Sequence, residues 1–389
     1  MIEKSNRPVV VTHIISGDIW AGAESQAFEL LSGLQSGLAI KPTAVVFNPG
    51  LIMDKLTNIG IPVTCADERR LSTIEIIKVI RDHLKSNSTD IVHTHGFKEN
   101  VLGTVAQKLN GVPRSVRTVH GNPETAPVWK NPKRRITDVL DQLIGRFGQD
   151  TIVAVSSQLE AHLSVIYPGK TEKIYNFIDI NFEEPESNHQ ILTENQISAP
   201  VSVGLVGRLV PVKRVDIFIE TIELLRNQLS FPIKGVVIGD GPLMQSLKIQ
   251  VKKKGLEEVI EFKGFIENPT EELKKLNALI MPSDHEGMPM VLLESLANKI
   301  PIVAHAVGGI PEILASGKAG FLVSNHCPKG YAEKVESLLT NAKTTRNISD
   351  FGFQHLKKNF DRLTGIEKYQ SIYLRLYNNV GIDNLSLRP

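Results

Sequence analysis

Short β-branched and apolar runs alternate with stretches of helical periodicity along most of the chain, and this alternation constrains the fold more than any other feature. Apolar strands joined by helices are typical of parallel sheets covered on both faces. In the first half we expect strands at 9–15, 43–47, 61–65, 91–95, 115–120 and 151–155. We expect the helices of that half at 24–35, 73–85 and 98–109.

A polar, acidic stretch at 181–200 carries Pro185 and Pro200 and lacks sustained periodicity, which predicts a linker. The alternation then resumes. Strands are expected at 201–206, 235–238, 260–263, 278–281 and 302–304. Helices are expected at 215–227, 243–253, 290–298 and 332–340, and a last periodic segment, 363–377, follows a break near Asp361.

A chain of 389 residues exceeds one ordinary core, so we predict two doubly wound parallel-sheet domains. Residues 1–180 form the first and 201–361 the second. A C-terminal helix at about 362–389 is expected to pack back on the first domain. No repeat of about 20–50 residues is evident, which excludes a solenoid. Ligands of such sheets bind beyond the carboxyl ends of the strands.

Composition excludes several classes of protein. Lys and Arg number 44 against 42 Asp and Glu, so a dedicated nucleic-acid binder is not expected. The only cysteines, Cys65 and Cys327, cannot form a disulfide framework or a cysteine zinc site. The N-terminus lacks a signal-peptide pattern and no apolar run is long enough to span a membrane. We therefore expect a cytoplasmic protein, with any membrane contact peripheral.

The strongest functional cluster is Pro282-Ser-Asp-His-Glu-Gly-Met-Pro-Met-Val-Leu-Leu-Glu294. A strand is expected to end at Pro282, and Pro289 stands where the first turn of a helix belongs. The backbone N–H groups of Met290, Val291 and Leu292 would then point out of the helix. Together with the helix dipole, they predict a diphosphate site.

Two carboxylates flank that helix start. Glu286 precedes it and Glu294 lies about one turn into it, so the two serve different parts of one ligand. A carboxylate suits sugar or ribose hydroxyls because it accepts two hydrogen bonds. The alternative is a capped helix with two solvated glutamates, which the spacing of the acids alone favours.

Two further turns follow expected strands. In Gly207-Arg208-Leu-Val-Pro-Val-Lys213, two cations flank a tight turn and could neutralise a diphosphate. The glycines of Gly239-Asp-Gly241-Pro permit close backbone approach. A solvated basic turn and a simple turn are the respective alternatives.

In the first half, Gly22, Ala23 and Glu24 begin a helix after the first strand, and His120 with Gly121 ends another strand. His120 is placed at the carboxyl-end rim, where a structural and a functional role are equally favoured. No G-x-G-x-x-G with a trailing acidic residue follows the first strand, so a nicotinamide dehydrogenase is disfavoured.

A basic, aromatic segment leads into another helix. Its residues are Trp129, Lys130, Lys133, Arg134 and Arg135, and the helix carries an apolar stripe of Ile136, Val139, Leu140, Leu143, Ile144 and Phe147. The basic entrance favours an anionic membrane surface, whereas the stripe favours a helix packed on the core.

The ordered set of motifs resembles the GT-B glycosyltransferases of family 4 over roughly residues 9–360. It comprises Gly22-Ala-Glu, His120-Gly, Gly207-Arg…Lys213, Gly239-Asp-Gly-Pro, Glu286-x7-Glu294, Val307-Gly-Gly-Ile-Pro-Glu312 and Gly320-Phe-Leu-Val323. The resemblance implies two Rossmann-like domains facing each other across a cleft, with an N-terminal acceptor side and a C-terminal donor side. It departs from the family pattern at Ala21, where a first glycine is common, and at Pro289, which removes one N–H.

By this resemblance the donor is a nucleotide-diphosphate sugar. Arg208 and Lys213 hold its diphosphate, Glu286 and the backbone of Met288, Pro289 and Met290 hold the sugar, and Glu294 holds the ribose. Further donor contacts are implied for Gly22, Ala23, Glu24, His120, Gly207, Gly239, Gly241, Gly287, Val291 and Leu292. The segment 262–266, with Phe265, lines the nucleobase, and His120 lies beside the transferred sugar.

The resemblance further implies that the anomeric configuration is retained, and that neither a metal nor a cofactor is needed. A UDP-sugar is favoured over a GDP-sugar, and a lipid-linked or polysaccharide glycan is the expected acceptor. Two alternatives use the same cleft: a nucleotide-sugar epimerase and a non-catalytic scaffold that binds sugar nucleotides. Isomerisation without an acceptor would indicate the first, and binding without turnover the second.

Overall fold

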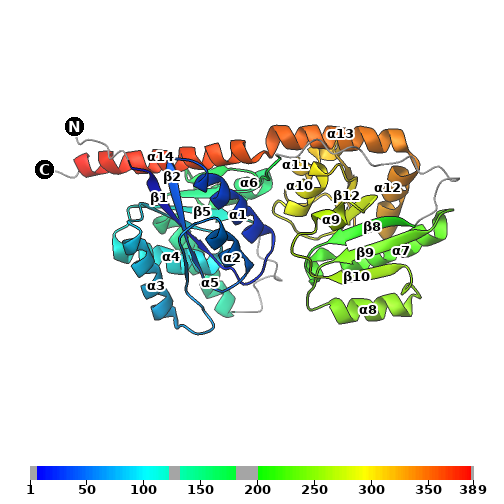
Figure 1. The fold of residues 1–389 in the computed structure, drawn as a ribbon, viewed down its shortest axis with the longest axis horizontal. Coiled ribbons are helices and arrows are strands. Elements are labelled where there is room, and N and C mark those ends of the chain that lie inside the picture. The colour runs from blue at the N-terminus through cyan, green and yellow to red at the C-terminus, as the bar shows by residue number, and fades with distance from the viewer. Residues whose placement is uncertain (1–6, 122–131, 181–199, 387–389) are drawn as a thin grey trace. The chain divides into compact units, whose positions relative to one another are not determined.

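A computed structural model describes residues 7–121, 132–180 and 200–386, with the backbone alone given for 132–138 and 380–386. The chain divides into two compact units (Figure 1). One comprises Met1–Asp179 with Arg362–Pro389, and the other comprises Ile180–Asp361. The expected boundaries at 180 and 361 lie within one residue of this division, and the expected linker falls almost wholly outside the described residues.

The first unit is built on a seven-stranded parallel sheet of order β3-β2-β1-β4-β5-β6-β7. Its strands are β1 Val9–Ile15, β2 Ile40–Val46, β3 Val63–Cys65, β4 Ile91–Thr94, β5 Arg114–Val119, β6 Thr151–Ala154 and β7 Thr171–Lys173. Its helices are α1 Gly22–Gln35, α2 Leu51–Asn58, α3 Thr73–Ser86, α4 Phe97–Asn110, α5 Pro132–Gly148, α6 Ser157–Ile166 and α14 Arg362–Ser386.

The central strand β1 is buried along its whole length because both faces of the sheet are covered. Val9 and Val11 belong to one apolar cluster, which also contains residues of α1 and α14. Ile14 belongs to another cluster, with residues of α3 and α4. Alternate side chains of β1 therefore enter different layers, as the two-residue period of a strand requires.

The C-terminal helix α14 completes the core of this first unit. Ile366, Tyr369 and Tyr373 are buried among residues of β1, α1, β4 and β5. A Cβ on Gly33 of α1 would lie 1.8 Å from Ile366 Cδ1, so the two helices approach closely only because Gly33 has no side chain. The helix begins at Arg362, whose N–H donates to the carbonyl of Ile178 at 3.0 Å.

The second unit carries a six-stranded parallel sheet of order β10-β9-β8-β11-β12-β13. Its strands are β8 Val201–Val206, β9 Ile233–Ile238, β10 Ile260–Gly264, β11 Ala278–Met281, β12 Ile302–His305 and β13 Phe321–Val323. Its helices are η2 Pro211–Lys213, α7 Val215–Gln228, α8 Met244–Lys253, α9 Thr270–Leu273, α10 Met290–Ala297, α11 Ile310–Ile313, η3 Ala315–Gly317, α12 Pro328–Thr340 and α13 Ala342–Asn359.

Both sheets have the doubly wound strand order that reverses at β1/β4 and at β8/β11. In sheets of this order, ligands bind beyond the carboxyl ends of the strands at these reversal points. Among the described helices, none combines the length and the apolar character that crossing a membrane requires.

Candidate active site

Four loops at the carboxyl edge of the second sheet are tied together by backbone hydrogen bonds. They follow β8, β9, β11 and β12. The bonds run from Leu209 N–H to Asp240 C=O at 2.9 Å, from Leu243 N–H to Leu209 C=O at 3.1 Å, from Asp284 N–H to Val212 C=O at 2.8 Å, and from Gly309 N–H to Gly287 C=O at 2.7 Å. Segments remote in sequence thus form one continuous surface, which contains most of the predicted donor residues.

Glycines make this close approach of loops possible. Gly239 has a φ of +140°, and a Cβ there would lie 1.9 Å from the carbonyl oxygen of Gly207. At Gly308, with a φ of +57°, a Cβ would lie 1.7 Å from the carbonyl oxygen of Glu286. No other residue fits either position without moving backbone. The close approach at Gly239 is thus between the loops after β8 and β9.

Lys213 and Glu286 form an ion pair across two of these loops. The Nζ of Lys213 donates to Oε1 of Glu286 at 2.6 Å, and the side chains are only 18% and 9% exposed. Lys213 ends the short helix η2, and the next residue, Arg214, has a left-handed φ of +48°. The Arg214 guanidinium bonds Asp216 and Asp284, which fixes the end of η2 to the β11 loop. The half-buried Arg208 lies earlier in the loop that carries Lys213.

The helix α10 begins at Met290, as expected for the segment 290–298, but Pro289 occupies the N-cap and not the first turn of the helix. The N–H of Leu292 donates to the carbonyl of Pro289 at 3.2 Å. Of the three amides predicted to point outward, that of Leu292 is therefore already engaged. The amides of Met290 and Val291 are the ones whose position in the first turn leaves them without an intrahelical acceptor.

The remaining predicted donor residues lie around this start. Met288, Pro289 and Met290 are buried, and Glu294 is half-buried in the second turn of α10. Phe265 directly follows β10 and its side chain is 56% exposed. The preceding Gly264 accepts a hydrogen bond from the N–H of Gly239 at 2.8 Å, so the backbone before Phe265 adjoins the loop after β9.

A separate hollow of about 460 Å³ lies between the start of α7 and the side of α8. Its lining includes Arg214, Asp216, Leu243, Gln250 and Asp284. None of the residues predicted to contact the donor lines it, although Leu243 and Asp284 belong to the loops that form the donor surface.

In the first unit, the predicted loop residues begin α1 after β1. Ala21 is its N-cap and makes no side-chain cap, and Gly22 is exposed at the first helical position. Glu24 is buried, and burial raises the pKa of its carboxyl to about 7. Glu99, in the first turn of α4, was not predicted. Burial likewise raises the pKa of Glu99 to about 7, and the negative charge of Asp18 raises the pKa of both carboxyls further.

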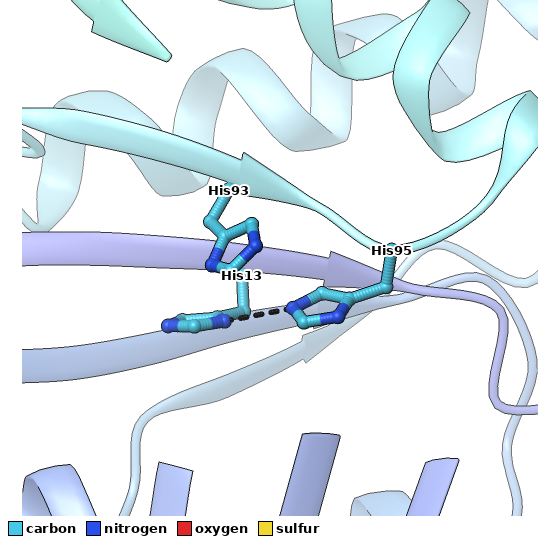
Figure 2. A group of neighbouring side chains, drawn as sticks. All are labelled: His13, His93 and His95. Carbon is cyan, nitrogen blue, oxygen red and sulfur yellow. Dashed lines mark hydrogen bonds between the residues drawn. The ribbon is translucent and has the colours of Figure 1, made fainter. Parts of the chain in front are cut away.

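A chain of buried histidines ends at the predicted His120. Nδ1 of His13 lies 3.0 Å from Nε2 of His95, and Nδ1 of His95 lies 3.1 Å from Nε2 of His120. Figure 2 shows His13 on β1 reaching toward His95, which follows β4, with the ring of His93 beside them. Strand register explains the grouping, because His13 pairs directly with His93 in the parallel β1–β4 ladder.

All of these imidazoles are held neutral. Burial lowers the pKa of His13 to about 3 and that of His120 to about 4, and it lowers the pKa values of His93 and His95 well below the usual 6.5. The sequence signal that could have found them is His93-Thr94-His95 at the end of an expected strand. His13 could not have been added to it, since only the order of strands brings β1 beside β4.

The basic segment before α5 is only partly described. Trp129 and Lys130 lie outside the described residues, and for Lys133, Arg134 and Arg135 the structure gives the helical backbone alone. In the rest of α5, four residues of the apolar stripe are exposed, by 54% for Val139, 45% for Leu140, 48% for Leu143 and 75% for Phe147.

Other residues of α5 face the rest of the first unit. Asp141 pairs with Arg117 at 2.9 Å and accepts from Asn100 at 2.8 Å. A Cβ on Gly145 would lie 2.6 Å from the ring of Tyr167. The helix is thus anchored through polar and small residues. The interpretation of the stripe as a core-facing surface is wrong for Val139, Leu140, Leu143 and Phe147.

Two doubly wound units, with glycine-rich loops at the carboxyl edge of the second sheet, define the class of GT-B glycosyltransferases. The model for glycosyltransferase family 4 matches residues 20–182, and the model for group 1 glycosyl transferases matches residues 193–355. The chain belongs to the GT-B glycosyltransferases of family 4, and it is an enzyme that uses a nucleotide-sugar donor. The comparisons do not support the alternatives of an epimerase or a scaffold.

Characterised relatives and solved structures agree with this assignment. N-acetyl-alpha-D-glucosaminyl L-malate synthase of Bacillus anthracis is 27% identical over 293 residues, covering 73% of this chain and 74% of that protein. The UDP-Gal:alpha-D-GlcNAc-diphosphoundecaprenol alpha-1,3-galactosyltransferase of Escherichia coli is 24% identical and covers 97% and 100%. The structure of Anabaena HepE with UDP and glucose superposes with a TM-score of 0.79 at 18% identity, covering 94% and 99%.

Proposed function

We propose that this enzyme transfers a sugar from a UDP-sugar to a hydroxyl acceptor with retention of anomeric configuration. One observation carries the proposal: the loops after β8 and β11 place the Lys213–Glu286 pair beside the start of α10. A cation, a carboxylate and two helix-start amides then converge on one surface. These are the groups that a diphosphate joined to a polyol requires.

Each group has a proposed part. The diphosphate binds Arg208, Lys213 and the amides of Met290 and Val291, while Glu286 accepts from sugar hydroxyls and Glu294 from the ribose. Phe265 stacks beside the base, because an exposed aromatic face next to a ligand loop suits a flat ring. In the first unit, His120 contacts the transferred sugar, and Gly22, Ala23 and Glu24 border it.

The reaction we propose needs no protein nucleophile. The bond between the anomeric carbon and the diphosphate oxygen breaks, and the acceptor oxygen forms its bond on the same face. The acceptor proton passes to a departing diphosphate oxygen. Arg208, Lys213 and the start of α10 stabilise the charge that grows on this leaving group, and loss of one such group costs about 3 kcal/mol in the barrier. No metal is required where these positive groups neutralise the diphosphate.

UDP is the favoured nucleotide because two relatives point to it. The Escherichia coli relative carries UDP-Gal in its name, and HepE was solved with UDP-glucose. The first experiment is calorimetric titration with UDP, GDP and ADP on the wild type, on Arg208→Ala and on Lys213→Ala. Lys234→Ala is a matched control, since Lys234 pairs with Glu261 at the surface at 2.8 Å, with both side chains 42% exposed.

Selective UDP binding, weakened in both site variants and unchanged in Lys234→Ala, supports the proposed donor site. Absence of binding by any of the three nucleotides to the folded wild type contradicts it. Product analysis by NMR with a hydroxyl acceptor then distinguishes retention from inversion at the anomeric carbon.

We further propose that the acceptor is a lipid-linked or polysaccharide glycan met at an anionic membrane surface on the cytoplasmic side. The exposed stripe of α5 carries this proposal. Val139, Leu140, Leu143 and Phe147 are exposed, and the same helix begins among Lys133, Arg134 and Arg135. An apolar face with a basic end matches the interface of an anionic bilayer.

Vesicle co-sedimentation tests this second proposal. Phe147→Ser is compared with Val165→Ser, because Val165 is 83% exposed on α6 and lies outside the stripe. We expect the wild type and Val165→Ser to bind phosphatidylglycerol vesicles at low salt, and Phe147→Ser to bind them more weakly. Failure of the wild type to bind these vesicles refutes the membrane proposal and leaves the donor proposal untouched.

A further inference from the structure

Three imidazoles, of which His13 and His95 are buried and His120 is half-buried, form a single hydrogen-bonded chain that runs from inside the first sheet to its carboxyl edge. His13 bonds His95 at 3.0 Å, and His95 bonds His120 at 3.1 Å. Among the described residues, neither Nε2 of His13 at the inner end nor Nδ1 of His120 at the outer end has a hydrogen-bond partner, and both atoms are buried. Both ring nitrogens of His95 are thus engaged within this row of imidazoles, and one nitrogen at each end, on His13 and on His120, is available for a further bond.

Only two arrangements of protons satisfy both bonds. A neutral imidazole carries one N–H, so one of its ring nitrogens is a donor and the other is an acceptor. His95 therefore donates in one of its two bonds and accepts in the other. Either all three residues carry the proton on Nδ1 and donate toward His120, or all three carry it on Nε2 and donate toward His13. Any mixed arrangement sets two lone pairs or two N–H groups against each other in at least one of the bonds.

The inner end selects between them. With protons on Nδ1, the open Nε2 of His13 is an unsatisfied acceptor. With protons on Nε2, it is an unsatisfied N–H donor in a residue with no exposed surface. Each arrangement leaves one open N–H donor, on His120 with protons on Nδ1 and on His13 with protons on Nε2. Orphaned donors are rarest where nothing can reach them, and His13 has no exposed surface, whereas His120 is half-buried at the carboxyl edge of the sheet, where a ligand can reach it. The Nδ1 arrangement is the favoured one.

We propose that His13 and His95 are positioning residues that hold His120 in its Nδ1–H tautomer, so that His120 presents an N–H donor to a sugar oxygen of the substrate. This inference rests on the proposed function for the identity of the partner atom. The direction of the chain itself rests on the contacts of the first unit alone.

A metal ion is the competing occupant of this cluster. The ligand atoms of His13, His93 and His95 lie within 4.8 Å of one another. However, both ring nitrogens of His93 are engaged, Nδ1 with the Tyr373 hydroxyl at 2.7 Å and Nε2 with the Thr118 hydroxyl at 2.8 Å. His13 and His95 bond each other directly. Binding a metal would break these contacts, whereas the hydrogen-bonded chain uses them.

The test reads the tautomer directly. Long-range proton–nitrogen NMR on histidine-labelled full-length enzyme distinguishes protonated from unprotonated ring nitrogens, and His120→Gln assigns the signals. We expect His120 to be protonated on Nδ1. A proton on Nε2 of His120 overturns the proposal, and so does a stoichiometric metal ion in the purified enzyme.

Two variants of His95 test its positioning role. In His95→Asn the amide nitrogen stands near the former Nδ1 and still donates to His120, whereas His95→Leu donates nothing. We expect His95→Leu to lower kcat about 10- to 100-fold, as loss of an outer-shell partner of histidine does, while UDP affinity stays unchanged. His95→Asn should recover most of the activity.

His83→Leu is the matched control for loss of a buried histidine. His83 is buried and bonds the hydroxyls of Thr64 and Thr43, and neither bond belongs to the chain. If His83→Leu lowers kcat as much as His95→Leu, or if His95→Asn is as poor as His95→Leu, the positioning role is refuted. If the wild type does not bind UDP, the proposed function fails, and the tautomer measurement still decides the inference.

Discussion

The Nζ of Lys213 lies 2.6 Å from Oε1 of Glu286, so two residues proposed to hold different parts of the donor are bonded to each other in the ligand-free chain. Binding of a diphosphate must therefore compete with the carboxylate for the lysine. Since both side chains are mostly buried, this competition is only weakly screened by solvent.

This relationship predicts opposite effects on binding for the two partners. In Glu286→Gln the lysine no longer has a charged competitor, so UDP should bind at least as tightly as to the wild type. Turnover of the UDP-sugar should nevertheless fall about 100-fold, because a sugar contact of the transition state is lost. In Lys213→Ala, UDP binding should weaken. Calorimetry and initial rates provide the two readouts, and a Glu286→Gln enzyme that binds UDP as poorly as Lys213→Ala contradicts the prediction.

Gly308→Ala should destabilise the second unit more than Gly255→Ala. Both glycines have a positive φ, +57° and +63°, and so share the cost of a left-handed residue, about 1 kcal/mol. Only at Gly308 does the new Cβ meet backbone, at 1.7 Å from the Glu286 carbonyl oxygen, whereas Gly255 has nothing within 4 Å. The clash should add about 1–3 kcal/mol. Thermal unfolding compares the pair, and equal midpoints would show that the loop yields freely.

Glu99→Gln should stabilise the protein more at pH 8 than at pH 5. Burial raises the folded-state pKa of Glu99 to about 7, so between about 4.5 and 7 the folded state holds a proton that the unfolded state has lost. Stability contributed by this group is therefore present below pH 4.5 and is lost as the pH rises through 7. The relative gain of the glutamine variant should reach about 2 kcal/mol.

Urea unfolding at the two pH values measures this gain. Glu271→Gln serves as the control, because the side chain of Glu271 is 74% exposed and its carboxyl is solvated in both states. A gain for Glu99→Gln that does not change between pH 5 and pH 8 would show that Glu99 is ionised in the folded protein at both values.

Tyr373→Phe should lower the stability of the first unit by about 1–2 kcal/mol, because it leaves Nδ1 of the buried His93 without its partner at 2.7 Å. Tyr377→Phe, four residues further along the same helix, alters a half-buried ring and should have a smaller effect. Urea unfolding of the two variants provides the comparison. A larger loss for Tyr377→Phe would place the main anchor of α14 nearer its end.

Much of the fold could be predicted because long apolar strands and strongly periodic helices are local signals. The expected strands 9–15, 201–206 and 278–281 match β1, β8 and β11 residue for residue. The helices α2, α6, α9, α11 and α13 and the strand β7 were not predicted. All but α13 are short, and their formation depends on packing against neighbours more than on a sustained pattern of their own. The helix α13, of 18 residues, was missed although it is long.

The candidate site was predictable only where its residues share a loop. Glu286 and the start of α10 are close in sequence, and so are Arg208 and Lys213. The pairing of Lys213 with Glu286 spans 73 residues and depends on the order β8-β11 in the sheet. The engagement of the Leu292 N–H depends on Pro289 being the N-cap, whose carbonyl accepts it, whereas the prediction placed Pro289 in the first turn.

The position of α14 bears on how the chain is made. Ribosomes release residues in order, so the whole second unit is synthesised before Ile366, Tyr369 and Tyr373 emerge to fill the core of the first. The unit that is made first is thus completed last, and until then its apolar surface on β1 and α1 is exposed to the cell. A nascent or prematurely terminated chain that stops at residue 361 carries an intact second unit and an open first one, which makes it a substrate for chaperones and proteases.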